Sequence, residues 1–248
     1  MDMRYFFTPE DRLPPDAGFS LWGREHLCWL LIAAALTVAA CLVFRRASRR
    51  GKDALRRGVG GAVLALEVLK NWNLWMQGSL NLYFLPLHLC SLAVFFTFFH
   101  SLRPGALLGN FLYSTCMPGA LSALLFPDWT VFPAFSFHAV LGFLSHTLLT
   151  AYPLMLLAGG DLRPEPRRLP GCLALLAALA AAVYAFDRAF SVNYMFLLLP
   201  APGSPLEWFA ALWGNPGYQL GFLPLILSIW GLLYLPFLRR EGRKNDKR

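Results

Sequence analysis

Charged residues are scarce in this chain of 248 residues, and acidic ones are the scarcest, with 14 Asp and Glu against 22 Lys and Arg. Only 15% of the residues are charged, whereas a soluble globular domain carries about 25%. The composition therefore excludes an ordinary soluble enzyme. The basic excess does not indicate a nucleic-acid partner, because it lies in short runs beside apolar stretches, as in RRASRRGKDALRR (45–57).

Paired cysteines and the common catalytic motifs are also absent. The five cysteines, at positions 28, 41, 90, 116 and 172, form no C-x-x-C or similar pair, so neither a disulfide framework nor a structural zinc site is indicated. The chain contains no G-x-S-x-G, P-loop, G-x-G-x-x-G or H-E-x-x-H motif. The sequence predicts neither a metal nor a cofactor.

Long apolar runs dominate what is present, since 57% of the residues are hydrophobic and the mean hydropathy is +0.49. A helix needs roughly 20 apolar residues to cross the hydrocarbon core. The sequence predicts an all-α membrane domain over 22–238, between an N-terminal interfacial arm (1–21) and a basic tail (239–248). Its seven expected spans are 22–44, 58–76, 80–100, 106–126, 134–157, 171–190 and 217–238.

The distribution of Lys and Arg over alternate loops predicts the orientation. With seven spans, one side of the membrane carries 17 basic residues and the other four. Because the basic side faces the cytoplasm, we expect the N-terminus outside and the C-terminus inside. The expected location is the inner (cytoplasmic) membrane, as a multi-pass protein.

Ionisable residues inside a bilayer need a partner or a purpose. Glu67, Lys70 and Asn71 share one face of the second expected span, at spacings i, i+3 and i+4. Two interpretations stay open, a structural ion pair and part of a functional site. His88 and Cys90 open the third span, where on a regular helix they would point about 200° apart, so each needs a partner from another helix.

The fifth expected span carries a polar stripe. His138 lies near the membrane edge, whereas His146 lies near the middle, with Gly142 as a notch and Ser145 on the same side. Together with Asn193 after the sixth span, these residues predict a polar pocket in the outer half of the bilayer. Its Phe, Trp and Leu walls suit an acyl chain, so membrane lipids are the expected partners.

Several segments resemble the YwaF-like family of integral membrane proteins. They are GREHL (23–27), LPLHLCS (85–91), PGALSALLFPD (118–128), FLSHTLL (143–149) and VNYMFL (192–197). The eukaryotic relative, transmembrane protein 164, is regarded as an acyltransferase that remodels phospholipids with a membrane-embedded Cys and His. The resemblance places His146 on the family's fifth-helix histidine and Asn193 in its Asn-containing motif.

The nucleophile of that relative falls on a different position. Its cysteine directly precedes the third-helix histidine, where this chain has Leu87, and the cysteine here follows His88 by two residues. Cys90 is about one helical turn from the family position, so it is the first candidate nucleophile. Ser91 and Ser145 are the alternatives.

The leading functional hypothesis is phospholipid acyl transfer or hydrolysis. In it Cys90 attacks an ester carbonyl and His146 is the general base. Glu67 or Asn71 orients the imidazole or holds the oxyanion, and Lys70 attracts a phosphate head group. An acyl donor lipid and an acceptor lipid are then the substrates.

Three alternatives belong to other classes. A transporter would use the charged and histidine residues as successive proton-accepting or ion-binding groups across the membrane. Against this, no polar residue is expected in the inner half of helices three, five and seven, and no inverted repeat is visible. Zinc hydrolysis is disfavoured because the histidines differ in depth. The third alternative is a non-catalytic membrane scaffold held together by its polar residues.

Overall fold

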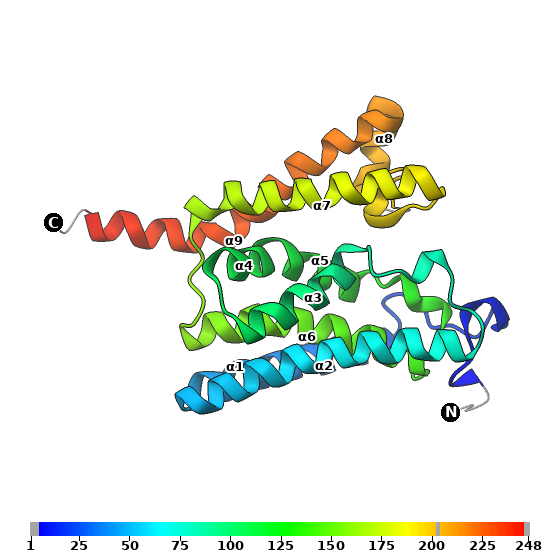
Figure 1. The fold of residues 1–248 in the computed structure, drawn as a ribbon, viewed down its shortest axis with the longest axis horizontal. Helices are drawn as coiled ribbons and strands as arrows, with labels where there is room; N and C mark the ends of the chain where they lie inside the picture. Colours follow the sequence, from blue (N-terminus) through cyan, green and yellow to red (C-terminus); the bar gives the residue numbers. More distant parts are fainter. Residues whose placement is uncertain (1–4, 202–203, 246–248) are drawn as a thin grey trace.

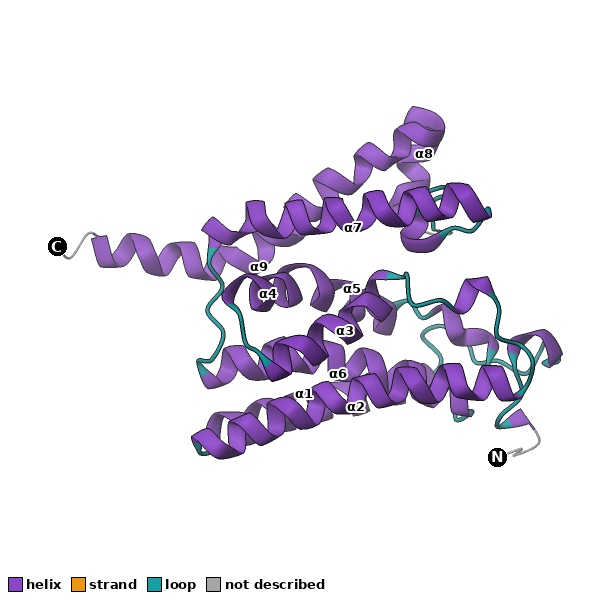
Figure 2. Ribbon diagram, in the orientation of Figure 1, coloured by secondary structure: helices purple, strands orange, loops and turns teal. Residues whose placement is uncertain are grey.

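The computed structural model describes residues 5–201 and 204–245, with side chains described as far as residue 237. Every regular element in these ranges is a helix, as Figure 2 shows, which confirms the all-α prediction for the described residues. The principal helices are α1 (Arg24–Arg46), α2 (Arg49–Met76), α3 (Leu89–Leu102), α4 (Ala106–Phe111), α5 (Met117–Leu125), α6 (Phe137–Gly159), α7 (Leu169–Phe190), α8 (Pro205–Gly217) and α9 (Phe222–Asn245).

The helices lie in layers (Figure 1). One layer holds α1, α2 and α6, a second holds α3, α4 and α5, and a third holds α7, α8 and α9. Helix α6 is the most enclosed long helix, because α1, α2, α3 and α5 all pack against it. Twelve of its 23 residues are buried, and they include polar ones such as His138 and Thr147.

Four segments are long and apolar enough to cross a membrane, namely Arg24–Arg46, Phe137–Gly159, Pro166–Phe190 and Pro205–Phe237. Large apolar side chains are exposed on their outer faces, for example Leu31 at 71% and Leu232 at 75%. In water such surfaces are unfavourable, whereas in lipid they are the ordinary exterior. Helix α3 is apolar but has only 14 residues. The seven-span arrangement stays a prediction.

The third expected span begins later than residue 80, since α3 starts at Leu89. Asn81 Oδ1 accepts the Tyr83 N–H at 2.9 Å and starts a short 3-10 turn (Leu82–Phe84). Pro86 then lacks an N–H and disfavours helix in the residue before it. His88 is consequently the extended residue ahead of the helix (φ −66°, ψ 149°), so the regular-helix angle expected between His88 and Cys90 does not apply.

A π-helical segment, Leu112–Cys116, joins α4 to α5. Pro118 lacks the N–H that would bond the carbonyl of Ser114 in a regular helix. Trp230 of α9 donates its indole N–H to that carbonyl at 3.0 Å. The proline therefore creates an acceptor inside the membrane domain, and the indole from another layer satisfies it.

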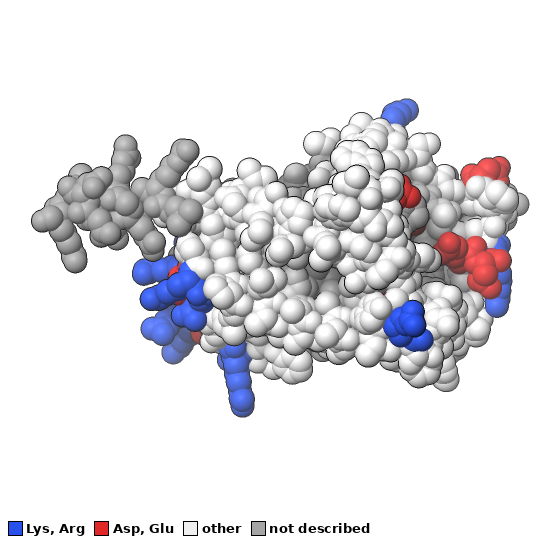
Figure 3. All heavy atoms as spheres, turned by 90° about the horizontal axis from the view of Figure 1, so that it is seen from above, with Lys and Arg blue, Asp and Glu red and all other residues white. Residues whose placement is uncertain are grey.

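Basic side chains gather at one end of the molecule (Figure 3), over the turn between α1 and α2 and the connection from α6 to α7. The expected span 58–76 lies within the longer α2, whose basic first turns are helical from Arg49. Lys52 Nζ donates to the Gly159 carbonyl at 2.7 Å and to Asp161 at 2.8 Å. A cation at the C-terminus of α6 complements the helix dipole. The predicted basic tail (239–248) lies outside the described side chains.

Candidate functional site

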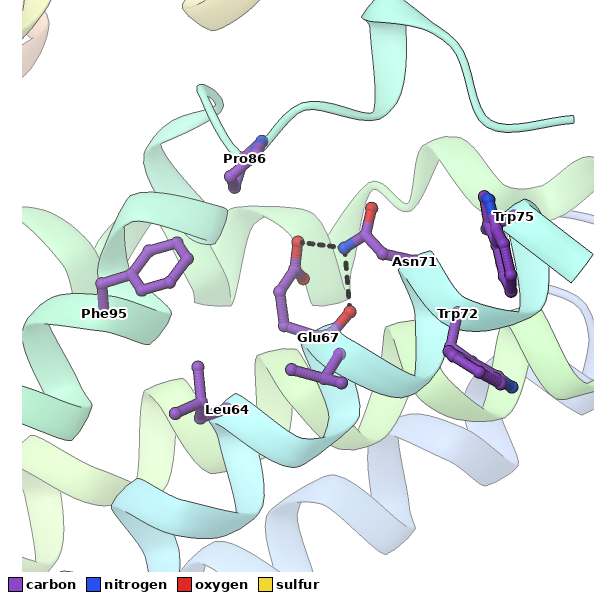
Figure 4. A pocket seen from close by; sticks show the side chains of 8 residues that line it. Leu64, Glu67, Asn71, Trp72, Trp75, Pro86 and Phe95 are labelled. Carbon is purple, nitrogen blue, oxygen red and sulfur yellow. Dashed lines mark hydrogen bonds between the residues drawn. The ribbon is translucent and has the colours of Figure 1, made fainter.

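An open groove of about 340 Å³ lies between α2 and the start of α3 (Figure 4). Apolar and aromatic side chains form its walls, and Glu67 and Asn71 are its polar lining residues. The walls are Leu64, Val68, Trp72, Trp75, Pro86 and Phe95. Apolar walls hold a mostly apolar ligand, and a few polar groups at one point of such a groove fix the ligand's orientation.

Glu67 is the centre of the polar group in this groove. Lys70 Nζ donates to both carboxylate oxygens, at 2.8 and 2.9 Å, and Asn71 Nδ2 donates to Oε1 at 3.2 Å. The Glu67 side chain is only 10% exposed, whereas that of Lys70 is 30% exposed. The three residues expected on one helix face therefore do form one cluster, because i, i+3 and i+4 side chains meet on a helix.

His146 of α6 is half-buried under an aromatic ring. The indole of Trp129, in the 3-10 turn Asp128–Val131, stacks on its imidazole with centroids 4.8 Å apart and planes at 26°. Gly142 permits this approach, since a Cβ there would lie 2.9 Å from the Trp129 ring. The notch expected at Gly142 is thus filled by Trp129.

The tautomer of His146 follows from its hydrogen bond. Nδ1 lies 2.8 Å from the Gly142 carbonyl, which can only accept, so Nδ1 carries the hydrogen. Nε2 then keeps its lone pair and can accept a proton from a nucleophile or a substrate. The backbone bond leaves His146 in the form that a general base requires.

The elements that carry the other candidate residues pack against α2. Cys90 lies on α3 and His146 on α6, and α2, α3 and α6 contact one another. His88 lies in the connection directly before α3. Within the described ranges, however, no hydrogen bond joins His146, His88 and Cys90 to one another. The fold brings these residues into one neighbourhood without making a dyad.

His88 contacts the connection that follows α7. Its Nδ1 accepts the backbone N–H of Met195 at 3.4 Å, and its ring lies edge-to-face with Tyr194 at 4.8 Å. Asn193 belongs to this connection, and its side chain bonds the backbone of residues 198 and 199. Asn193 therefore shapes a loop beside His88 and does not extend into the groove. Ser145, another expected site residue, is half-buried on α6.

Two histidines lie outside the site. Both ring nitrogens of His26 are hydrogen-bonded, whereas His138 has a stacking partner and a buried Nε2 without a hydrogen bond among the described residues. His26 is fully buried, with its Nδ1 accepting the Trp22 N–H at 3.0 Å and its Nε2 donating to the Leu124 carbonyl at 2.9 Å. His138 stacks on Phe132 with ring centroids 4.9 Å apart. Among the described residues, no three His, Cys, Asp or Glu side chains form a group that could hold a metal ion.

Polar residues are also present in the half of the bundle nearer the basic end, contrary to the expectation from sequence. His100 of α3 pairs with Tyr152 of α6, with Nδ1 2.9 Å from the hydroxyl. Tyr234 of α9 donates to Asn110 Oδ1 at 3.0 Å. Sequence reasoning missed these pairs because each joins two helices, and spacing along one helix does not show which residues of another helix it meets.

Sequence reasoning also assigned no role to Asp128, Trp129 and Asp187. Asp128 and Trp129 follow Pro127 at the end of α5, where they look like an ordinary polar turn, and only the fold brings them over α6. Asp187 is fully buried near the end of α7. A carboxylate within an apolar run was the available signal for Asp187.

The fold and the composition define an all-helical membrane protein with several apolar helices. The chain matches the TMEM164 family over residues 21–234, so it belongs to that family, and the resemblance noted from its motifs is confirmed. No curated protein and no solved structure matches it. Family membership establishes the class of membrane protein, and the chemistry has to be argued from the site.

Proposed function

We propose that this protein modifies membrane phospholipids by acyl transfer or hydrolysis in the outer half of the bilayer. The observation that carries the proposal is the groove of Figure 4, in which a buried carboxylate, Glu67, and the Asn71 amide bonded to it interrupt apolar walls, with the ammonium of Lys70 paired to the same carboxylate. Charged groups are costly to place in lipid, so a charged residue within a membrane-spanning segment is a candidate for a functional site. Cys90 and His146 lie on α3 and α6, which both pack against α2.

The reaction uses a thiol and an imidazole. The Cys90 sulfur attacks the ester carbonyl of a phospholipid, and its proton passes to Nε2 of His146. The C–O ester bond breaks, the leaving lysolipid oxygen takes that proton, and the acyl group stays on sulfur as a thioester. A second lipid hydroxyl or water then attacks the thioester and releases the thiol. Because no hydrogen bond joins Cys90 and His146 in the structure, the two must approach when substrate binds.

The α2 cluster supports this reaction in two ways. Asn71 Nδ2 donates its two hydrogens to the Glu67 carbonyl at 2.9 Å and to the Glu67 carboxylate at 3.2 Å, so it serves a developing oxyanion only after it releases the longer of these bonds. The ammonium of Lys70 is partly exposed and offers a contact for the phosphate of the head group. The apolar walls formed by Leu64, Val68 and Phe95 then hold an acyl chain.

Transfer of a labelled acyl chain tests the proposal. Purified protein in lipid nanodiscs is given a phospholipid labelled in its acyl chain, and the labelled products are separated by chromatography. We expect His146→Gln and Cys90→Ala to lose at least tenfold in rate, because each removes a group that makes or breaks a bond. The matched controls are His138→Gln, on the same helix, and Cys116→Ala, a buried thiol near Cys90.

Full activity in His146→Gln would remove the mechanism. Activity that survives in Cys90→Ala but is lost in His146→Gln would move the nucleophile to Ser91 or Ser145. No labelled product from the unmodified protein with any donor and acceptor lipid would favour the transporter or the scaffold.

Transport is the second candidate, and the polar pairs near the basic end favour it. The pair of His100 and Tyr152 and the pair of Asn110 and Tyr234 continue polar groups beyond the groove. Proteoliposomes that take up a solute or protons, with uptake lost in His100→Gln, would support this candidate over lipid chemistry.

We infer the topology from the charge asymmetry. Seven spans with the N-terminus outside put the basic end of Figure 3 in the cytoplasm, as the distribution of Lys and Arg favours. A periplasmic or extracellular reporter signal from a fusion after Arg248 would contradict this orientation, and it would leave the lipid chemistry to be tested by the acyl-chain assay.

A further inference from the structure

The N-terminal arm, described from Tyr5, packs over the start of α6. It lies at the end of the molecule opposite the basic side chains (Figures 1 and 3). The Phe137 N–H is one of the first donors of α6, which no carbonyl of that helix can accept, and it donates to the Phe6 carbonyl at 2.8 Å. The Phe7 ring contacts that of Phe137, with centroids 5.2 Å apart. The arm therefore belongs to the packed fold.

Further along the arm, Gly18 and Phe19 cross the turn Asp128–Val131 that carries Trp129. The Phe19 N–H donates to the Thr130 carbonyl at 2.9 Å. A Cβ at position 18 would overlap the same carbonyl oxygen, so glycine is required for the arm to come this close. The arm thus fixes the backbone directly after Trp129.

The Phe19 ring makes a second contact with the same region. It belongs to one apolar cluster with Trp129 and Phe143. The ring of Phe143 is fully buried and lies between the other two, 5.8 Å from that of Phe19 and 5.3 Å from that of Trp129. Both the backbone and a side chain of the arm therefore support the turn.

Trp129 has no hydrogen bond from its own ring to hold it in place. Its indole N–H is buried and has no acceptor among the described residues. Its backbone (φ −86°, ψ 19°) is not helical, and the turn is closed only by the Phe132 N–H, which donates to the Trp129 carbonyl at 3.2 Å. The position of the indole is therefore set by its packing against other segments.

We propose that Trp129 is a positioning residue for His146, and that Gly18 and Phe19 of the arm hold it in that position. The indole covers one face of the imidazole at 4.8 Å while Nδ1 bonds the Gly142 carbonyl, so the imidazole is fixed and its Nε2 keeps one direction. The purpose rests on the proposed function, since a general base must direct its lone pair at the proton it accepts. The stacking of the two rings can be measured without reference to that function.

Proton NMR of the histidine rings measures this stacking. Protein labelled with ¹³C in histidine is placed in lipid nanodiscs, and the ring signals of His146 are assigned by their loss in His146→Gln. An aromatic ring shifts protons above its face upfield, so Trp129→Leu should move a His146 signal downfield and define the complete loss of the stack. Gly18→Ala should move the same signal in the same direction by at least half that amount, because the added methyl group displaces the arm from Thr130.

Three further variants separate positioning from packing. Gly61→Ala adds a methyl group where no atom lies within 4 Å, so it should leave this signal in place. Leu30→Ala opens a cavity on the α1 side of the same apolar cluster but keeps the arm contacts, so it should also leave the signal in place. Phe19→Leu stays apolar but loses the ring contact with Phe143, and it should give a smaller downfield shift. This milder variant provides the test if Gly18→Ala does not fold.

The outcomes distinguish this inference from the proposed function. An unchanged His146 signal in Trp129→Leu would overturn the inference, and so would an unchanged signal in Gly18→Ala, or in Phe19→Leu where the glycine variant does not fold. An equally large shift in either control variant would overturn it as well, because any disturbance would then suffice. The expected shifts without lipid activity would remove the proposed function and leave the positioning role intact, whereas acyl transfer with unchanged signals would do the reverse.

Discussion

Removal of the ammonium from the Glu67–Lys70 pair should destabilise the protein more than removal of the carboxylate charge. The two side chains differ in burial, since Glu67 is 10% exposed and Lys70 is 30% exposed. In Lys70→Met the carboxylate stays buried and keeps only one hydrogen bond, from Asn71 Nδ2 to Oε1 at 3.2 Å. Losing one partner of a fully buried pair costs about 3–5 kcal/mol, and the partial exposure of Lys70 reduces this to about 2 kcal/mol.

In Glu67→Gln the buried side chain at position 67 no longer carries a charge. The amide oxygen can still accept from Asn71, and the long stem of Lys70 can carry its ammonium toward the interface. Lys70 lies about 9 Å along the axis from the end of α2 at Met76, a distance that its side chain and a local water contact can span. We therefore expect Glu67→Gln to cost less than about 1 kcal/mol. The double variant should resemble Glu67→Gln, because no unpaired charge remains buried.

Thermal unfolding in one detergent measures this asymmetry. One kcal/mol corresponds to about 2–4 °C in Tm for a chain of this size, so Lys70→Met should lower Tm by about 4–8 °C and Glu67→Gln by less than about 4 °C. Adding Glu67→Gln to Lys70→Met should recover part of the loss. A Tm drop in Glu67→Gln equal to or larger than that in Lys70→Met, or an additive double variant, would refute the burial argument.

Two further predictions concern single contacts. Gly142→Ala places a Cβ 2.9 Å from the Trp129 ring, so we expect a loss of about 1–3 kcal/mol, with altered tryptophan fluorescence as the ring leaves His146. An unchanged fluorescence spectrum would contradict this stacking. Arg167 and then Arg168 lower the pKa of Glu165 by hydrogen bonding. The carboxylate thus adds stability above its ordinary pKa that is lost as pH falls. The Tm difference between Glu165→Gln and the parent should therefore disappear in acid, and a difference independent of pH would count against the prediction.

The chain's composition was sufficient to predict its class. Apolar runs of helical length and a low fraction of charged residues specify a helical membrane protein, because a bilayer requires every backbone polar group to be satisfied within helices. The i, i+3, i+4 spacing likewise placed Glu67, Lys70 and Asn71 in one cluster, since helical geometry is local. Pro86 indicates that α3 begins only after it, but the hydropathy of the surrounding residues predicted a span from residue 80.

Contacts between segments far apart in sequence were decided only by the tertiary structure. Three contacts show this: the ring of Trp129 over His146, the backbone of Met195 against His88, and the pair of His100 and Tyr152. Each joins segments whose relative placement no periodicity specifies. Spacing along a helix fixes which side chains share a face, whereas packing between helices fixes what that face meets. The sequence by itself therefore determined that this is a helical membrane protein with polar residues in its spans, and the packing of the layers decided which of those residues share a site.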